Sequence, residues 1–264
     1  MLFMCIAYLA LATDPQWPLF IAANRDEFHQ RPTRAAAPWP DYPHVIGGLD
    51  LQAGGTWFAV STQGRFALLT NFRDMFPATG LEKSRGELPK QFLIQTLSAQ
   101  DYIQQVAEQG HLYQGFNLIV GQWHAQKAEF ECYYYSNRND TQPQALAPGH
   151  YVLSNHLLNT PWPKSQRLCE RLQHYLSAQT PASISEVYAI LRDEQKAEDH
   201  LLPQTGLSLE RERLLSSPFI ISPDYGTRSS TVWQVSQSGH SFFHECSYNP
   251  QGKETERHSW PLLL

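Results

Sequence analysis

The opening stretch of the chain contains two apolar segments separated by a polar turn, and this pattern constrains the fold more than any other. The apolar segments are residues 5–12 and 19–23, and between them stands Thr13-Asp14-Pro15-Gln16. Aspartate and proline favour turns, so two short apolar segments joined in this way predict a β-hairpin. The chain is therefore expected to begin with antiparallel sheet.

Strand and helix signals continue along the chain in an order that extends this sheet. Strands are expected at residues 56–60, 65–70, 116–120, 129–135, 151–154, 219–221, 231–235 and 241–246. The proline-rich residues 32–43 are expected to form a loop. Helices are expected between residues 84 and 110, at 163–176 and at 184–191, with Ser84 and Glu87, and Ser183 and Glu186, as capping pairs. Hairpins separated by helical pairs imply an α+β fold of largely antiparallel sheet with helices on its outer faces.

Length and composition are those of one globular domain that spans residues 1–264. Hydrophobic residues make up 42% of the chain, which is enough apolar surface to offset the entropy of ordering it. The formal net charge is −5, so the positive field that attracts phosphates is absent and nucleic acid is not an expected partner. The longest apolar stretch near the start falls far short of the roughly 20 residues that a spanning helix needs, so no membrane span is expected.

Cysteine usage indicates a reducing compartment. Cys5, Cys132, Cys169 and Cys246 are widely scattered and form no CxxC motif, so neither a disulfide framework nor a zinc ribbon is encoded. The first four residues carry no basic side chain ahead of the apolar stretch, so they do not form a signal peptide. A cytoplasmic location is therefore expected.

Cys5, at the beginning of the first expected strand, is the best candidate for a reaction centre. A buried structural cysteine is the alternative, because free cysteine behaves as a small hydrophobic residue. If translation begins at Met4, removal of that methionine leaves Cys5 with its own α-amine beside the thiol. An amine with a pKa of about 7.7–8 can accept the proton of a thiol with a pKa of about 8.5.

The residues before Cys5 decide whether this chemistry is available. Leu2 is too bulky for ordinary removal of Met1, so aminopeptidase cannot expose Cys5 from Met1. We expect Met4 to be the true start and residues 1–3 to be a misassigned beginning. Cleavage before Cys5, or a protein that does not use an N-terminal nucleophile, are the alternatives.

The block Asn24-Arg25-Asp26-Glu27 closes the strand that pairs with the first, so the hairpin can place these groups beside Cys5. A solvated turn with a local salt bridge is the alternative. In the functional interpretation Arg25 lowers the pKa of the thiol and binds a carboxylate or carbonyl, and Asp26 holds the α-amine. Successive residues on a strand face opposite sides, so Arg25 and Asp26 can both reach the site only if the strand turns there.

Three further polar residues stand at the ends of apolar strands. Asn71 follows residues 67–70, Asn155 follows residues 151–154, and Arg228 precedes residues 229–232. Each alone is typical of a cap or turn. Together they supply what acyl transfer needs beyond a nucleophile, which is amide donors for an oxyanion and a second fixed cation.

Many ordered motifs, spread over nearly the whole chain, resemble the NRDE-motif family, whose eukaryotic members are named transport and Golgi organisation proteins. A lone Asn-Arg-Asp-Glu would be a weak signal, whereas this ordered set is specific. The motifs are Cys5, Ala22-Ala23-Asn24-Arg25-Asp26-Glu27-Phe28, Ala53-Gly54-Gly55-Thr56-Trp57, Leu69-Thr70-Asn71-Phe72-Arg73-Asp74, Ser84-Arg85-Gly86-Glu87, Gly115-Phe116-Asn117-Leu118, Tyr135-Ser136-Asn137-Arg138, Leu153-Ser154-Asn155, Thr160-Pro161-Trp162-Pro163-Lys164 and Tyr225-Gly226-Thr227-Arg228-Ser229-Ser230-Thr231-Val232.

That family is in turn similar to the cysteine branch of the N-terminal-nucleophile hydrolases, which includes bile-salt hydrolases, penicillin V acylases and isopenicillin acyltransferases. The resemblance implies an αββα sandwich. It also implies catalytic roles for six residues, namely the nucleophile Cys5, Arg25 and Asp26 of the second strand, the oxyanion and positioning asparagines Asn71 and Asn155, and the late arginine Arg228. Candidate binding residues are Asn24, Glu27, Trp57 and Arg73. Arg25 and Asp26 are adjacent here, whereas the hydrolase pattern separates them, so their individual roles stay open.

Two functions follow from these residues. The first is cysteine-dependent hydrolysis or transfer of an acyl group from an amide or thioester, in lipid or acyl-coenzyme A metabolism. The alternative is a binding or carrier protein for acyl-coenzyme A, lipid or haem, because a fold does not fix a reaction. No cofactor is expected, and the expected partner is a small acyl or lipid-like ligand, with haem as an alternative.

Two weaker ligand signals remain. His240, His244 and Cys246 would share one face of a strand and could hold a metal, but polar residues on a strand are ordinary and no metal is expected. Haem ligation by a histidine or by a tyrosine of residues 133–135 stays open.

Overall fold

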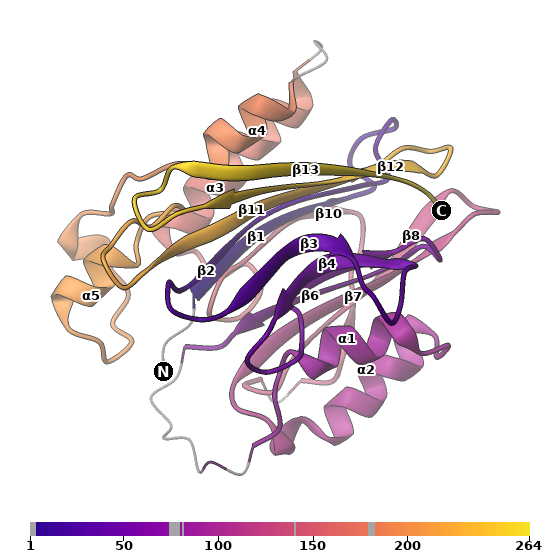
Figure 1. Cartoon of the computed structure of the whole chain (residues 1–264), viewed down its shortest axis with the longest axis horizontal. Coiled ribbons are helices and arrows are strands. Elements are labelled where there is room, and N and C mark those ends of the chain that lie inside the picture. Colours follow the sequence, from indigo (N-terminus) through magenta and orange to yellow (C-terminus); the bar gives the residue numbers. More distant parts are fainter. Residues whose placement is uncertain (1–3, 74–79, 81, 140, 179–182) are drawn as a thin grey trace.

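Two antiparallel sheets, stacked face to face, form the centre of the molecule (Figure 1). The computed structural model describes residues 4–73, 80, 82–139, 141–178 and 183–264, with only the backbone of Met4. Residues 1–3, predicted to be a misassigned beginning, and Asp74 of the fourth motif lie outside the described residues.

The first sheet contains the N-terminal hairpin at its centre. Its strands, in spatial order, are β10 (Gly149–Leu153), β1 (Met4–Leu11), β2 (Leu19–Phe28), β11 (Tyr225–Val235), β12 (His240–Tyr248) and β13 (Glu254–Leu263). The second sheet follows the chain order from β3 to β9. Its strands are β3 (Thr33–Pro38), β4 (Val45–Asp50), β5 (Phe58–Ser61), β6 (Arg65–Asn71), β7 (Phe116–His124), β8 (Glu129–Ser136) and β9 (Gln144–Ala145).

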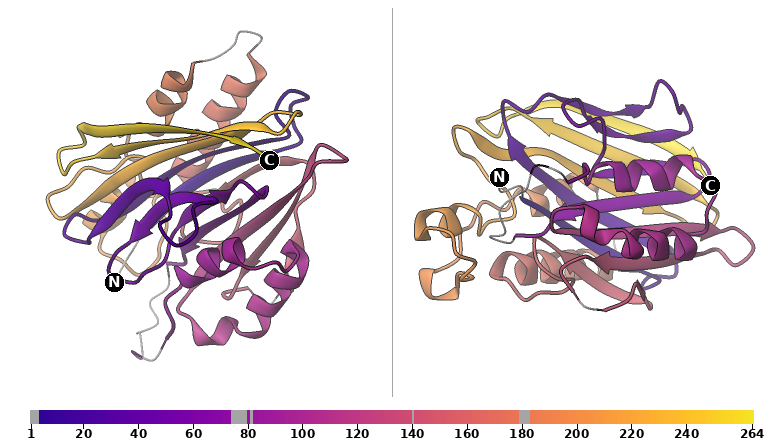
Figure 2. Two further views of the ribbon diagram at one scale, coloured as in Figure 1. Left: turned by 45° about the vertical axis from the view of Figure 1, so that its right-hand side comes forward. Right: turned by 90° about the horizontal axis from the view of Figure 1, so that it is seen from below.

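Helices cover the outer face of each sheet (Figure 2). α1 (Glu87–Ile94) and α2 (Ala99–Glu108) pack on the second sheet, and α3 (Pro163–Ser177) and α4 (Ile184–Leu191) pack on the first. The apolar core between the sheets includes Leu9, Ile21, Phe66 and Trp233. The predicted αββα sandwich is confirmed. Short helices complete the described elements, namely 3-10 turns at Gly110–Leu112 and Asp199–Leu201 and α5 at Leu209–Leu214.

The observed strands differ from the predicted ones at several places, and β4 and β9 are among the strands that were not predicted. β3 lies inside residues 32–43, which were expected to be a loop, because an edge strand tolerates proline without losing a ladder hydrogen bond. Residues 219–221 do not form a strand, since Ile221 makes only an isolated bridge with Gly226. β13 was missed because an exposed edge strand of polar residues lacks the apolar alternation that reveals a strand.

The predicted capping box at Ser84 and Glu87 does not form. The residue that precedes α1 is Gly86, no side chain caps the helix, and Ser84 contributes only its backbone carbonyl, at 3.2 Å from the Glu87 nitrogen. The helical region is also divided in two. Ser98 starts α2, and its hydroxyl accepts a hydrogen bond from the backbone N–H of Asp101.

The later helices lie where apolar spacing predicted them. α3 extends one residue beyond the predicted segment, and α4 has the predicted bounds. Ser183 does precede α4, but its hydroxyl accepts from the backbone N–H of Ser185, so Glu186 completes no reciprocal pair. Within the described part of the chain, no helix is both long and apolar enough to cross a membrane.

The register of the N-terminal hairpin fixes the starting point of the site. Cys5 on β1 stands directly opposite Arg25 on β2. Neighbouring odd-numbered residues of both strands pack between the sheets, whereas even-numbered residues such as Ile6 and Ala22 pack against α3 and α4. Cys5 and Arg25 therefore lie on the face between the sheets, and Asp26 lies on the helix-covered face.

Candidate active site

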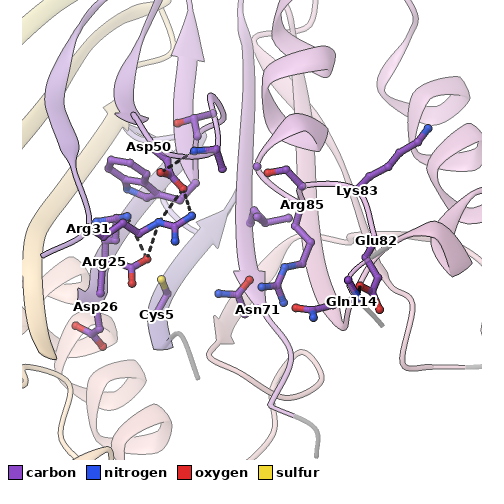
Figure 3. Close-up of a pocket in the computed structure, with 18 residues that line it drawn as sticks. Cys5, Arg25, Asp26, Arg31, Asp50, Asn71, Glu82, Lys83, Arg85 and Gln114 are labelled. Carbon is purple, nitrogen blue, oxygen red and sulfur yellow. Dashed lines mark hydrogen bonds and ion pairs between the residues drawn. The ribbon is translucent and has the colours of Figure 1, made fainter. Parts of the chain in front are cut away.

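A cavity of about 380 Å³ opens where β1 begins and where β2 and β6 end (Figure 3). Six of the ten predicted site residues line it. They are Cys5, Arg25, Asp26, Glu27, Trp57 and Asn71. Another part of the wall comes from the segment before α1, including Lys83, Arg85 and Gly86. The hairpin thus brings residues distant in sequence to one polar cavity.

Cys5 presents its sulfur to this cavity (Figure 3). Burial of the thiol, together with the negative charge of Asp26, raises its pKa to about 12. The backbone N–H of Asp26 and the guanidinium of Arg25 act in the opposite direction but do not overcome these effects. In the chain that continues before Cys5, the sulfur is therefore a thiol at neutral pH.

Asn155 and Ser154 hold the backbone of Cys5 on both sides. The side-chain oxygen of Asn155 accepts a hydrogen bond from the Cys5 nitrogen at 3.2 Å, and the Ser154 hydroxyl donates to the Cys5 carbonyl at 2.9 Å. The amide nitrogen of Asn155 donates to the backbone carbonyl of Asn71 at 2.9 Å. Asn155 therefore ties the ends of β1, β6 and β10 together, while the side chain of Asn71 stays directed at the cavity (Figure 3).

A chain of alternating charges forms one wall of the cavity. Arg25 pairs with Glu27 at 3.3 Å, Glu27 with Arg31 at 3.6 Å, and Arg31 with Asp50 at 2.6 Å. The Arg25 guanidinium also lies 4.1 Å from the ring centre of Trp57, and its Nη1 has no hydrogen-bond partner. The wall fixes Arg25 against the ring of Trp57, with the buried Nη1 left without a hydrogen-bond partner.

Asp26 points away from this wall, toward the helix layer, and is almost fully buried. Its Oδ1 accepts a hydrogen bond from the Thr227 hydroxyl at 2.6 Å, and its Oδ2 has no hydrogen-bond partner. Burial raises the pKa of Asp26, and the nearby charge of Lys164 is the largest influence that lowers it. Arg25 and Asp26 do diverge, as neighbouring strand residues must, yet both border the cavity because it lies at the strand end.

Arg228 occupies a β-bulge rather than the cavity wall. Thr227 pairs with Asp26 and Ser229 with Arg25, so Arg228 is the extra residue between them. Its Nη1 donates to the backbone carbonyls of residues 28, 29 and 31 at 3.0–3.3 Å. Arg228 thus lies at the expected end of the sheet, but it fastens the segment after β2 instead of facing the cavity.

Asn24 and Arg73, predicted as binding residues, are engaged elsewhere. The Asn24 side chain donates to the backbone carbonyls of Leu191 and Pro218 and accepts from Ser230, so it anchors the helix layer. Arg73 forms a buried ion pair with Glu212 of α5 at 2.6 Å. Neither residue lines the 380 Å³ cavity.

Sequence reasoning missed several groups that the fold brings to the site. Arg85 lines the cavity and belongs to a quoted motif, but that motif was interpreted as a helix cap. Lys164 closes another quoted motif and was given no role. Arg31 and Asp50 carried no signal, because their pairing depends on the relative placement of β2 and β4.

The weaker ligand signals find no support in the described residues. No group of three His, Cys, Asp or Glu side chains that could hold a metal is found among them. His244 instead bonds to the Ser259 hydroxyl at 2.7 Å, and Cys246 is buried in the core under the helices. Tyr134 donates to the side chain of Asn117 between the sheets.

The raised thiol pKa predicts slow alkylation of Cys5 in protein that retains residues 1–4. At pH 7 we expect iodoacetamide to modify Cys5 roughly 100–1,000-fold more slowly than a free cysteine peptide, because only the thiolate reacts. The rate should rise about tenfold per pH unit up to at least pH 9. Peptide mass spectrometry of quenched samples measures it, and alkylation at the free-peptide rate at pH 7 would contradict the buried thiol.

Comparison with known proteins agrees with this architecture. A solved structure of a Caenorhabditis elegans N-acylethanolamine-hydrolyzing acid amidase ortholog superimposes with a TM-score of 0.52, at 12% sequence identity, covering 88% of this chain and 93% of that one. At that identity the likeness concerns the fold alone, and it places the chain in the N-terminal-nucleophile hydrolase fold.

Relatives found by their sequence share much more sequence identity with this chain than the amidase structure does. The chain is 39% identical to the transport and Golgi organization protein 2 homolog of Bos taurus, over 98% of this chain and 99% of that protein. It is 36% identical to the human homolog over 92% and 93% of the two chains. The family model described as Transport and Golgi organisation 2 matches residues 4–250. Every motif given above lies inside that match, and the chain belongs to the Transport and Golgi organisation 2 family.

Proposed function

We propose that the protein is an acyl-transfer enzyme in which Cys5, once it is the N-terminal residue, attacks the carbonyl of an amide or thioester. One observation carries this proposal. The thiol and the backbone nitrogen of Cys5 lie together at a polar cavity, and that nitrogen is already held by the side chain of Asn155 at 3.2 Å. Cleavage of the peptide bond before Cys5 would turn this nitrogen into an amine beside the thiol. Because the pKa of the thiol is raised, the sulfur needs such a neighbouring base to lose its proton.

The steps follow from the groups at the cavity. The α-amine takes the thiol proton, and the sulfur attacks the carbonyl carbon to form a tetrahedral intermediate. The amide of Asn71 and the guanidinium of Arg25 border the cavity and are the donors for the developing oxyanion. The α-ammonium returns its proton to the leaving amine or thiol as that bond breaks. The neutral amine then takes a proton from water or another acceptor, which attacks the thioester carbon. The acyl product leaves as its bond to sulfur breaks, and the proton passes to the sulfur to restore the Cys5 thiol.

Asn155 has a different role from Asn71 in this scheme. Both ends of its side-chain amide are used, one by the Cys5 nitrogen and the other by the Asn71 carbonyl. It therefore positions the nucleophile and does not serve as an oxyanion donor. Asp26, with its unpartnered Oδ2, is the group that can hold the α-ammonium.

The cavity wall indicates which part of the substrate lies there. Charged side chains of Arg31, Asp50 and Arg85 face it, so it suits a polar group better than a long apolar chain. We therefore place the polar part of an N-acyl amide or acyl thioester, such as a lipid amide or acyl-coenzyme A, in this cavity. The N-acyl amide named for the amidase of the same fold supports this class.

A carrier is the second candidate, and the thiol pKa of about 12 favours it. A protein that keeps residues 1–4 would have no α-amine and a weakly nucleophilic sulfur, yet the cavity with Arg25 and Arg31 could still bind an anionic acyl or lipid ligand, or haem. The state of the N-terminus therefore separates the two functions.

Two forms of the protein test the proposal. We expect protein isolated from cells to have the intact mass of a chain that begins at Cys5. Against a panel of N-acyl amides and acyl thioesters, that form should show turnover, and protein that retains residues 1–4 should show none, because it lacks the base. Full activity in protein that still begins with Met1 would rule out the α-amine as the base.

A further inference from the structure

Lys164 is a buried cation that the scheme above leaves without a role. It stands in the first turn of α3, at the end of the motif Thr160-Pro161-Trp162-Pro163-Lys164, and its side chain is only 2% exposed. α3 packs on the helix-covered face of the first sheet, which is the face from which Asp26 projects. Lys164 therefore approaches the strand end from the layer opposite the cavity.

The surroundings of Lys164 are unfavourable for a positive charge. Its ammonium is removed from water, and its Nζ has no hydrogen-bond partner. It also lies at a helix N-terminus, where the helix dipole disfavours positive charge. The aromatic ring of Trp162, at 6.0 Å from Nζ, is too distant to compensate fully. A buried charge with so little structural support is typical of a functional group.

The charged groups around Lys164 leave one carboxylate available to it. The groups that interact with its charge are Arg73, Asp26, Cys5 and Glu212. Glu212 is already bonded to Arg73 at 2.6 Å and to the side chain of Thr205. Asp26 has an Oδ2 without a partner, so it is the carboxylate that remains for Lys164.

Each member of this pair supports the charge of the other. Burial and the like charge of Arg73 lower the pKa of Lys164, and Asp26 opposes that shift. Burial raises the pKa of Asp26, while Lys164, Thr227 and Arg25 oppose the rise and Glu27 adds to it. Loss of Lys164 would remove the largest influence that keeps Asp26 ionised.

We propose that Lys164 is a positioning residue that acts through Asp26, keeping it a carboxylate so that it can hold the α-amine of Cys5. The role rests on the proposed acyl-transfer function, because Asp26 holds an amine only in a chain that begins at Cys5. Lys164 itself reaches no substrate in this role.

Infrared spectroscopy tests the link without requiring any substrate. The C=O stretching band of a protonated carboxyl, followed against pH and assigned to Asp26 by its loss in Asp26→Asn, gives the protonation midpoint. In Lys164→Met we expect this midpoint to rise by about one pH unit or more, because the compensating cation is gone. Lys164→Arg should keep it near the value of the unaltered protein, and Lys127→Met, which removes an exposed lysine in the β7–β8 turn, is the matched control.

Stability separates this role from a structural one. The folded state lowers the pKa of Lys164, so folding disfavours the ammonium form and loses stability. This loss of stability is fully present below the lowered pKa and disappears as the pH rises toward alkaline values. In an Asp26→Asn background, where no carboxylate loses its cation, Lys164→Met should therefore raise Tm by about 2–4 °C at pH 6–7, and the gain should vanish at high pH. A purely structural lysine would lower Tm when replaced.

Turnover supplies a second measurement on the same variants. Lys164→Met should move the acidic limb of the pH–rate profile to higher pH, and it should add nothing further in an Asp26→Asn background. An unchanged Asp26 midpoint in folded Lys164→Met overturns the proposal. Absence of turnover in the unaltered protein would refute the acyl-transfer function alone, and the infrared midpoint would still decide whether Lys164 controls Asp26.

Discussion

Replacement of Cys5 by alanine, in protein that begins at residue 5, should lower turnover by roughly 10⁴-fold or more while leaving substrate affinity nearly unchanged. The thiol forms the covalent bond, so nothing else at the cavity can replace it. Binding contacts come instead from Arg25, Arg31 and the cavity wall, which the substitution leaves in place. Steady-state kinetics and calorimetric binding of the same substrate measure the two quantities.

Cys169→Ala is the matched control for this experiment. Cys169 is also a free, partly exposed cysteine, but it lies on α3 among the outer-layer contacts. It should retain the activity of the unaltered protein. If Cys5→Ala and the unaltered protein bind a ligand equally well and neither turns it over, the carrier function is the better description.

Glu212→Ala should reduce the free energy of unfolding by about 3–5 kcal/mol, because it removes the carboxylate that pairs with a buried guanidinium. Arg73 and Glu212 are 5% and 4% exposed, and their charged atoms are 2.6 Å apart. Lys164 adds a second cation to the same interior region, which increases the cost. Tm should fall by roughly 10 °C for a chain of this length.

Glu210→Ala controls for the loss of a carboxylate from the same helix. Glu210 is exposed and lies two residues before Glu212 on α5, so its removal should change stability by less than about 0.5 kcal/mol. Chemical denaturation of both variants gives the comparison. Equal stability of Glu212→Ala and Glu210→Ala would show that the ion pair does not hold α5 in place.

Local patterns were sufficient to predict antiparallel sheet with helices on its outer faces, whereas the stacking of two sheets was predicted from the family resemblance. The apolar segments around Asp14 and Pro15 specified the first hairpin, and leucine spacing along residues 163–176 specified α3. The same hairpin predicted that Cys5 and Arg25 would meet, because strand pairing across one turn fixes the register. The first hairpin and α3, which depend on adjacent segments, were therefore accessible from the sequence.

Features that depend on distant segments were not accessible. The pair of Arg73 and Glu212 joins residues 139 positions apart, and no local pattern indicates it. The bulge at Arg228 appears only when β11 is aligned with β2. Lys164 looked like an ordinary helix lysine, since burial of its side chain depends on how α3 packs on the sheet. The burial of a side chain and its hydrogen-bond partners depend on the folded structure and cannot be read from the sequence.

The central claim is that Cys5 forms a covalent acyl intermediate, and intact-mass spectrometry of rapidly quenched reactions tests it most directly. With protein that begins at Cys5 and an excess of a substrate that it turns over, the account predicts a mass increase equal to the acyl group. Peptide mapping should place that group on Cys5, and Cys5→Ala should show no increase. Turnover that proceeds with no acyl group on Cys5 at any time point would contradict the account.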